Sequence, residues 1–218
     1  MNKDGHYNEG FSENSGVKIF YRDYGPKDGD PILMVHGLGA QLVHWPIHLI
    51  NFLQANNFRP ITYDNRDVGL SSRFLNTPSF VIDYVKYFLR LPIKSEYTID
   101  DMASDGINLL DTLNIKKTHI FSTSMGGMIA QIISAQYPER VKSFTLIAST
   151  ASTPSPINAP KKAVRDIMME RSKNPNASHE EILEREIRMV SLIGMDGRIV
   201  DTPEFREETI RNLDRAQD

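Results

Sequence analysis

The 218-residue sequence predicts an α/β fold in which helices flank a mostly parallel sheet. Two observations predict it. Short apolar runs of strand length alternate with longer amphipathic segments of helix length, and the runs are continuous enough to be covered on both faces. A hydrophobic content of 40% also allows a substantial core. Because ligands of such sheets bind at the carboxyl ends of strands, we expect the chemistry just after strands.

The first predicted elements are a hairpin and a βαβ unit. Residues 9–14 and 17–24 alternate apolar and polar side chains around a Ser-Gly turn, as a half-buried antiparallel hairpin does. Residues 32–35 form a continuous apolar run, which is typical of a buried parallel strand. A helix over residues 46–56 and a strand over residues 60–63 complete the unit.

The same alternation continues along the chain. Thr98 and Asp101 have the spacing of a capping box and predict the start of a helix. A strand over residues 119–122 follows, and then a helix that ends before Pro138. A last strand is predicted over residues 143–148. Right-handed connections between these units give a mostly parallel sheet.

The composition changes at residue 152. Residues 1–151 hold all the predicted strands, whereas residues 152–218 contain a Pro-rich linker and then helices only, starting after Ser178 and at Pro203. We expect this second part to be a partial helical cap over the active edge of the sheet; a solvated helical appendage is the alternative. Residues 74–97 form an insertion whose aromatic residues indicate a short helix, which joins the cap or covers the core.

Composition excludes several classes of protein. The net charge is −3 with Lys and Arg scattered along the chain, so no nucleic-acid partner is expected. The absence of cysteine excludes disulfides, thiolate metal sites and a cysteine nucleophile, and we expect no metal site. The first nine residues are polar, and no apolar run reaches membrane-spanning length. We therefore expect a cytoplasmic protein with no membrane partner.

Ser124 is the candidate nucleophile. It lies between a predicted strand and a predicted helix, and Gly126 and Gly127 follow it, so the chain must turn sharply there. A nucleophile elbow needs this geometry to project a hydroxyl above the sheet. The usual pattern is G-x-S-x-G, and Ser122 replaces its first glycine. The alternative is a serine that only caps the following helix.

Two backbone N–H groups are candidates for an oxyanion hole. The Met125 N–H begins the helix after Ser124, where the helix dipole favours negative charge. The second candidate is the Leu38 N–H, in the His-Gly-Leu-Gly turn that follows a strand of the same predicted sheet. We interpret His36 as structural; the alternative for the glycines is that they serve only a turn. We also interpret Asp64, with Arg66 and Asp67, as holding a loop rather than binding a metal.

Three motifs in order resemble those of the α/β-hydrolase family: Val-His-Gly-Leu-Gly at 35–39, Tyr-Asp-Asn-Arg-Asp-Val-Gly-Leu-Ser at 63–71 and Ser-Thr-Ser-Met-Gly-Gly at 122–127. The second motif looks most like the branch that contains aclacinomycin methylesterase. The resemblance covers residues 16–148 and implies an α/β-hydrolase core. It assigns the nucleophile to Ser124 and the oxyanion donors to Leu38 and Met125.

In this family the triad acid and histidine follow later strands, after the cap. No residue of the 218 matches either of them, and we therefore expect the last strands to be missing. We interpret the sequence as a fragment, or a truncated gene product, of a longer hydrolase with weak or no activity of its own. We also expect the exposed sheet edge near the last predicted strand to favour self-association.

The resemblance implies hydrolysis of a small-molecule carboxylic ester through an acyl-enzyme on Ser124, without a cofactor. Amides, lactones and carbon–carbon bonds beside a ketone remain open for the same site. The alternative from another class is a non-catalytic ligand-binding or interaction protein that retains the elbow.

Overall fold

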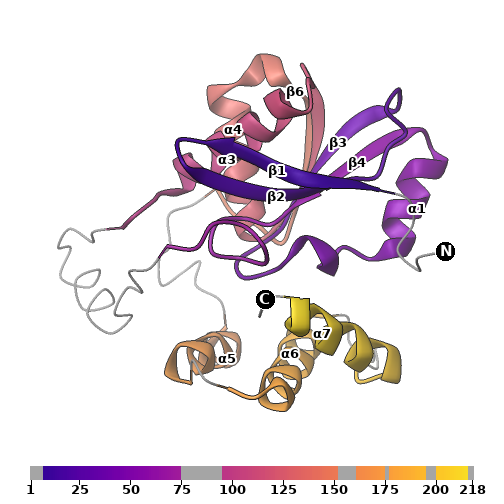
Figure 1. The fold of residues 1–218 in the computed structure, drawn as a ribbon. Coiled ribbons are helices and arrows are strands. Elements are labelled where there is room, and N and C mark those ends of the chain that lie inside the picture. Colours follow the sequence, from indigo (N-terminus) through magenta and orange to yellow (C-terminus); the bar gives the residue numbers. More distant parts are fainter. Residues whose placement is uncertain (1–6, 75–94, 152–160, 175–176, 195–199, 216–218) are drawn as a thin grey trace. The chain divides into compact units, whose positions relative to one another are not determined.

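The computed structural model describes residues 7–74, 95–151, 161–174, 177–194 and 200–215 (Figure 1). The chain forms two compact units, Met1–Ala151 and Ser152–Asp218. The predicted insertion helix, with Tyr84, Tyr87, Phe88 and Leu91, and the linker over residues 152–160 lie outside the described residues. The cap role of the second unit stays a prediction.

A six-stranded mixed sheet forms the centre of the first unit, in the order β1-β2-β4-β3-β5-β6 (Figure 1). Its strands are β1 Asn8–Asn14, β2 Val17–Asp23, β3 Asp30–Val35, β4 Phe58–Tyr63, β5 Thr118–Thr123 and β6 Val141–Ile147. β1 pairs with β2, and β2 with β4, in antiparallel fashion, whereas the other three pairings are parallel. The predicted hairpin and the mostly parallel sheet are therefore confirmed.

Helices cover both faces of this sheet. They are α1 Ile47–Ala55, α3 Ile99–Thr112 and α4 Met125–Gln136, with short 3-10 helices η1 Leu42–His44 and η2 Pro138–Arg140. Neighbouring side chains of β3 point to opposite faces. Leu33 packs in the cluster with α3 and α4, and Met34 packs in the cluster with α1 and Trp45. The sheet is thus buried from both sides, as the continuous apolar runs predicted.

The described part of the second unit consists of three helices, α5 Lys162–Lys173, α6 His179–Ile193 and α7 Pro203–Arg215. The predicted caps are present: the Ser178 N–H donates to Glu181 Oε2 at 2.7 Å, and Thr202 Oγ1 accepts from the Phe205 N–H at 3.2 Å. Arg206 of α7 donates to Glu184 of α6 at 2.8 Å and so ties these two helices together.

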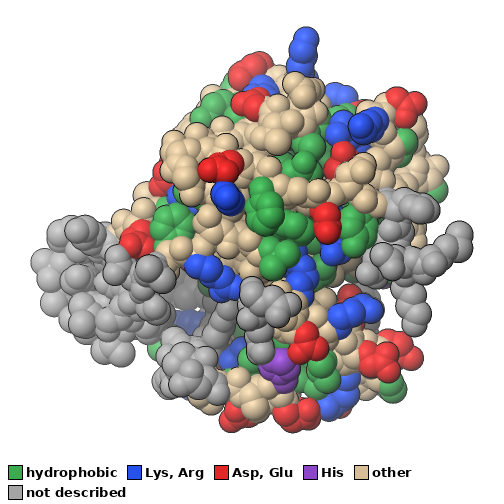
Figure 2. Space-filling model, viewed as in Figure 1, with side chains coloured by type: hydrophobic (Ala, Val, Ile, Leu, Met, Phe, Trp, Pro, Cys, Tyr) green, Lys and Arg blue, Asp and Glu red, His purple; other side chains and the backbone are tan. Residues whose placement is uncertain are grey.

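β6 is an edge strand with an apolar surface. Phe144, Leu146 and Ile147 have 42%, 38% and 43% of their surface exposed. On the face of the first unit shown in Figure 2, Lys and Arg are interspersed with Asp and Glu rather than gathered in one field. None of the described helices combines the length and apolar character needed to cross a membrane.

Candidate active site

Ser124 occupies the sharp turn between β5 and α4. Its backbone has φ 52° and ψ −123°, a strained conformation for a residue that carries a Cβ. Two hydrogen bonds hold it: the Ser124 N–H donates to the Ile147 carbonyl at 2.9 Å, and the Ser124 carbonyl accepts from the Gly127 N–H at 2.9 Å. The residue is exposed. This is the strand–turn–helix geometry that the elbow interpretation requires.

The hydroxyl of Ser124 does not cap α4, because its side chain makes no capping hydrogen bond. The alternative that this serine serves as a helix cap is therefore wrong for this structure. Ser122, in the place of the usual glycine, is buried, and its hydroxyl donates to the Thr145 carbonyl of β6 at 2.8 Å. The substitution is accommodated because the neighbouring strand supplies an acceptor.

The glycines after Ser124 allow α4 to approach the sheet. A Cβ at Gly126 would lie 2.2 Å from the Val35 carbonyl oxygen, and one at Gly127 would lie 2.4 Å from Ser149 Oγ. Neither position has room for a Cβ unless the neighbouring atoms move. The Gly-Gly pair thus allows close packing between α4, the end of β3 and the segment after β6.

The turn after β3 lies against Ser124. A Cβ at Gly37 would be 3.0 Å from Ser124 Cβ and 3.5 Å from its Oγ. The Gly37 carbonyl accepts from the Ala40 N–H at 3.4 Å, and Gly39 has φ +71°, so Leu38 is the second residue of a tight turn. The structure brings together the two segments that carry the candidate oxyanion donors Leu38 and Met125.

His36 packs beside this turn. Its ring stacks on Trp45 with the ring centroids 4.0 Å apart, and its Nδ1 lies 3.5 Å from Thr123 Oγ1. Burial, with a smaller effect of His44, lowers the pKa of His36 to about 3. The imidazole is therefore neutral near pH 7, which agrees with a structural interpretation.

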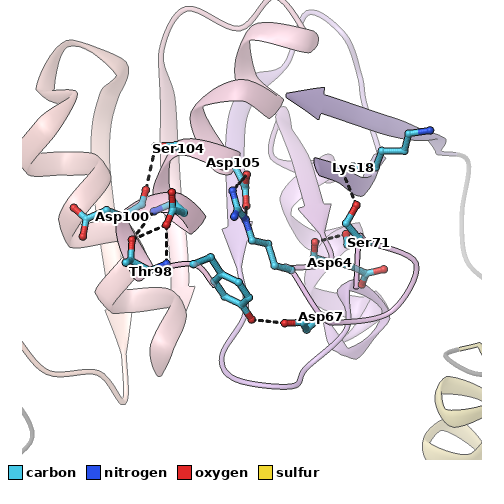
Figure 3. Close-up of polar contacts among 12 residues, drawn as sticks. Lys18, Asp64, Asp67, Ser71, Thr98, Asp100, Ser104 and Asp105 are labelled. Atoms are coloured by element: carbon cyan, nitrogen blue, oxygen red, sulfur yellow. Dashed lines mark hydrogen bonds and ion pairs between the residues drawn. The ribbon is translucent and has the colours of Figure 1, made fainter. Parts of the chain in front are cut away.

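The loop after β4 is held by its own carboxylates. Asp64 accepts two backbone N–H bonds, and Asp67 accepts from the Phe74 N–H at 2.7 Å. Asp67 also accepts from the Tyr97 hydroxyl at 2.6 Å (Figure 3). The interpretation that these residues hold a loop thus agrees with the structure. Arg66 pairs with Asp105 of α3, at 2.6 Å from Nε to Oδ2, rather than with a carboxylate of its own loop.

Burial raises the pKa of the Asp105 carboxyl, although the Arg66 guanidinium lowers it.

Within the described ranges, no group of three acidic or histidine side chains is arranged to hold a metal ion.

A family model described as alpha/beta hydrolase fold matches residues 30–180. The chain belongs to the α/β-hydrolase family. Rhodomycin D methylesterase DauP of Streptomyces sp. (strain C5) is 25% identical over 210 residues, which cover 89% of this chain and 65% of that protein. Rhodomycin D methylesterase DnrP of Streptomyces peucetius is 26% identical, over 90% of this chain and 66% of its own length. The chain thus spans just under two thirds of the length of these two methylesterases.

Solved structures of hydrolases share the fold. A carboxylesterase structure from the Thaumarchaeon Nitrososphaera gargenis has a TM-score of 0.66 with 20% identity, over 96% of this chain and 67% of its own. The 2-hydroxy-6-oxo-6-phenylhexa-2,4-dienoate hydrolase of Rhodococcus sp. strain RHA1 has a TM-score of 0.68 with 19% identity, over 98% and 67%.

A second serine has the hydrogen-bonded neighbours that the α/β-hydrolase mechanism uses. Ser143 Oγ lies 2.7 Å from His119 Nδ1, and His119 Nε2 lies 3.3 Å from Asp30 Oδ2. Asp30 also pairs with Lys142, whose hydrogen bond keeps the pKa of that carboxyl below its usual range. Sequence reasoning missed this set, because it depends on the register that places His119 opposite Ser143.

This set lies where β3 and β5 begin, whereas Ser124 follows the end of β5. Ser143 is also an ordinary strand residue, without the positive φ of Ser124. In the described part of the first unit, no histidine side chain hydrogen-bonds to Ser124. Ser143 is therefore a suitable control for Ser124.

Proposed function

We propose that this chain carries the nucleophile of a serine hydrolase that cleaves small-molecule carboxylic esters, with Ser124 forming the acyl-enzyme. The observation that carries the proposal is the strained backbone of Ser124, with φ 52° at the end of β5 and a hydroxyl that does not cap the next helix. The similarity to two methylesterases supports an ester as the substrate.

The proposed mechanism uses groups of this chain for attack and charge stabilisation. Ser124 Oγ attacks the carbonyl carbon, and the negative charge that develops on the carbonyl oxygen is stabilised by the N–H groups of Leu38 and Met125. The alcohol leaves with the hydroxyl proton. Water then attacks the acyl group, which releases the acid and returns a proton to Ser124 Oγ.

The general base for this mechanism is not assigned to a residue of the chain. Loss of a triad base lowers the rate by several orders of magnitude and leaves catalysis by the oxyanion hole and by binding. We therefore expect slow acylation of Ser124 in these 218 residues. No cofactor is part of the proposal, and residues 152–218 are proposed as a partial cap. The absence of cysteine fits the reducing compartment that a cytoplasmic location would provide.

The proposal is tested with a fluorophosphonate probe and with p-nitrophenyl acetate. We expect labelling at Ser124, detected by mass spectrometry of the peptide, and slow ester turnover; Ser124→Ala should abolish both. Ser143→Ala is the matched control, because Ser143 has a histidine within hydrogen-bond distance but no strained turn. If labelling survives in Ser124→Ala and disappears in Ser143→Ala, the reactive serine is Ser143 and the proposal is wrong.

A non-catalytic ligand-binding protein is the second candidate. It is favoured by one observation: within the described part of the first unit, Ser124 has no histidine partner. If this candidate is right, the wild-type chain shows neither labelling nor turnover while it remains folded.

A further inference from the structure

Asp64 is a completely buried side chain directly after β4, with an exposed fraction of 0%. Both of its carboxyl oxygens accept backbone N–H bonds: Oδ1 from Leu42 at 2.7 Å and Oδ2 from Leu70 at 3.1 Å. Its backbone carbonyl accepts from the Ser71 hydroxyl at 2.6 Å (Figure 3). Asp64 therefore connects its own loop to a segment that lies 22 residues earlier in the chain.

The earlier segment is the one that carries Leu38. Leu42 is the first residue of η1, and the first N–H groups of a helix have no carbonyl partner within it. Asp64 supplies that partner from another element. At the other end of the same segment, Asn65 Nδ2 donates to the His36 carbonyl at 3.2 Å. Adjacent residues after β4 thus anchor both ends of the turn.

Between these anchors, Leu38 is the most exposed residue of the turn, whereas Gly37 and Leu42 on either side of it are buried. The hydrogen bond within the turn, from the Ala40 N–H to the Gly37 carbonyl, is 3.4 Å long. The Leu38 side chain is 68% exposed and adds little packing. An oxyanion donor acts only if it is held in place before charge develops, and a displacement of about 1 Å can cost about 10²-fold in rate. The bonds from Asp64 and Asn65 restrict both ends of the segment that carries the Leu38 N–H.

We propose that Asp64 is a positioning residue for the oxyanion turn, with Asn65 as the second anchor. The inference rests on the proposed function, because it assigns a role in the geometry of the same site. Neither side chain contacts the reacting atoms. Their effect is on where the Leu38 N–H lies relative to Ser124.

The test compares Asp64→Ala with Asp67→Ala in the full chain. Both residues belong to the loop after β4, and each carboxyl accepts a backbone N–H bond. The bonds to Asp67 come from Phe74 and Tyr97, whereas Asp64 accepts from Leu42 at the end of the turn. We expect Asp64→Ala to lower kcat for p-nitrophenyl acetate about tenfold or more, with KM changed less than twofold. Asp67→Ala should leave both constants within about twofold of the wild type.

A second readout is specific to an oxyanion hole. The thiono analogue of the ester places negative charge on sulfur, a weaker hydrogen-bond acceptor than oxygen. The ratio of the oxo-ester rate to the thiono-ester rate should therefore fall in Asp64→Ala and stay unchanged in Asp67→Ala. An Asp64→Ala enzyme with the wild-type kcat and ratio, or with only a raised KM, would overturn the proposal.

Asn65→Ala provides a milder variant if Asp64→Ala does not fold. Asn65 Oδ1 has no hydrogen-bond partner in the described residues, so this substitution removes only the bond to His36. Amide hydrogen exchange over residues 37–42 is measured in the same samples, and we expect it to be at least about tenfold faster in the anchor variants than in Asp67→Ala.

The exchange measurement also separates the two proposals. If wild-type Ser124 proves unreactive, the proposed function fails, and with it the catalytic role of Asp64. If Ser124 reacts but exchange over residues 37–42 is the same in all variants, the positioning role fails while the proposed function stands.

Discussion

His36 shows how burial determines the chemistry of one side chain beside the candidate nucleophile. Because burial lowers its pKa to about 3, the folded protein holds this imidazole neutral, whereas the unfolded chain protonates it below pH 6.5. The unfolded state therefore binds more protons between these two values, and the free energy of unfolding falls as the pH is lowered through this range.

We predict that protonation of His36 in the unfolded chain alone lowers the free energy of unfolding. The expected decrease is about 1.4 kcal/mol for each unit by which the pH falls, from about pH 6 to about pH 4. Replacement by Phe keeps an aromatic ring to stack on Trp45 and removes the titration. Urea unfolding of His36→Phe at pH 6 and pH 4.5 should show a correspondingly weaker pH dependence than the wild type. His48→Gln, at an exposed position, is the control and should keep the wild-type dependence.

At the residue scale, the sequence predicted where a residue lies along its strand or helix better than which side chains it contacts. Ser124 was placed at a strand-to-helix turn by its neighbours alone, because Gly126 and Gly127 indicate a close approach. The Ser143–His119 contact and the Arg66–Asp105 pair were not predictable in the same way. Both depend on which strands and helices become neighbours, and the sequence does not encode that locally.

At the scale of elements, the start of α4 is determined by what its glycines touch. At Gly126 the obstacles to a Cβ are the backbone carbonyls of Val35 and His36, whereas at Gly127 they are the side chains of Ser149 and Leu146. Side chains can change rotamer, but a carbonyl in a buried strand moves only with the strand.

We therefore predict that Gly126→Ala destabilises the protein more than Gly127→Ala does. The expected cost for Gly126→Ala is about 3 kcal/mol, at the upper end of the usual overpacking cost. Urea unfolding of both variants measures the difference. If the two variants are equally stable, the backbone at the end of β3 moves as easily as the side chains of Ser149 and Leu146.

Helix starts were also predictable, because their signals are local. The Thr98–Asp101 and Ser178–Glu181 capping boxes both form as their spacing indicated, at the starts of α3 and α6. The ends of strands were predicted less closely. β6 begins at Val141, two residues before the predicted start, because pairing with β5 extends it.

At the scale of the whole molecule, the strand order could not be predicted from the sequence. The alternation of strands and helices indicated a mostly parallel sheet but not that β3 lies between β4 and β5. That order is decisive for the candidate site, because it makes the ends of β3 and β5 neighbours and so brings the turn at Gly37 next to Ser124. The family motifs implied this arrangement only by resemblance.

The exposed apolar surface of β6 leads to a prediction about assembly. We expect the chain to self-associate through this edge, since Phe144, Leu146 and Ile147 remain between 38% and 43% exposed. Light scattering after size-exclusion chromatography should show a mass that increases with concentration. Phe144→Lys should reduce this increase. Phe52→Lys, at a phenylalanine that is 63% exposed on α1, should not.

The hydrogen bond from the Ser124 N–H to the Ile147 carbonyl links the conformation of Ser124 to the edge strand β6. When the end of β6 frays, the elbow loses this acceptor, and the strained backbone at Ser124 can relax toward an ordinary conformation. Under the proposed function, the local opening equilibrium of β6 then limits the fraction of molecules in which Ser124 has its strained conformation. Any binding event that protects β6 from fraying would increase the reactivity of Ser124 without touching its hydroxyl.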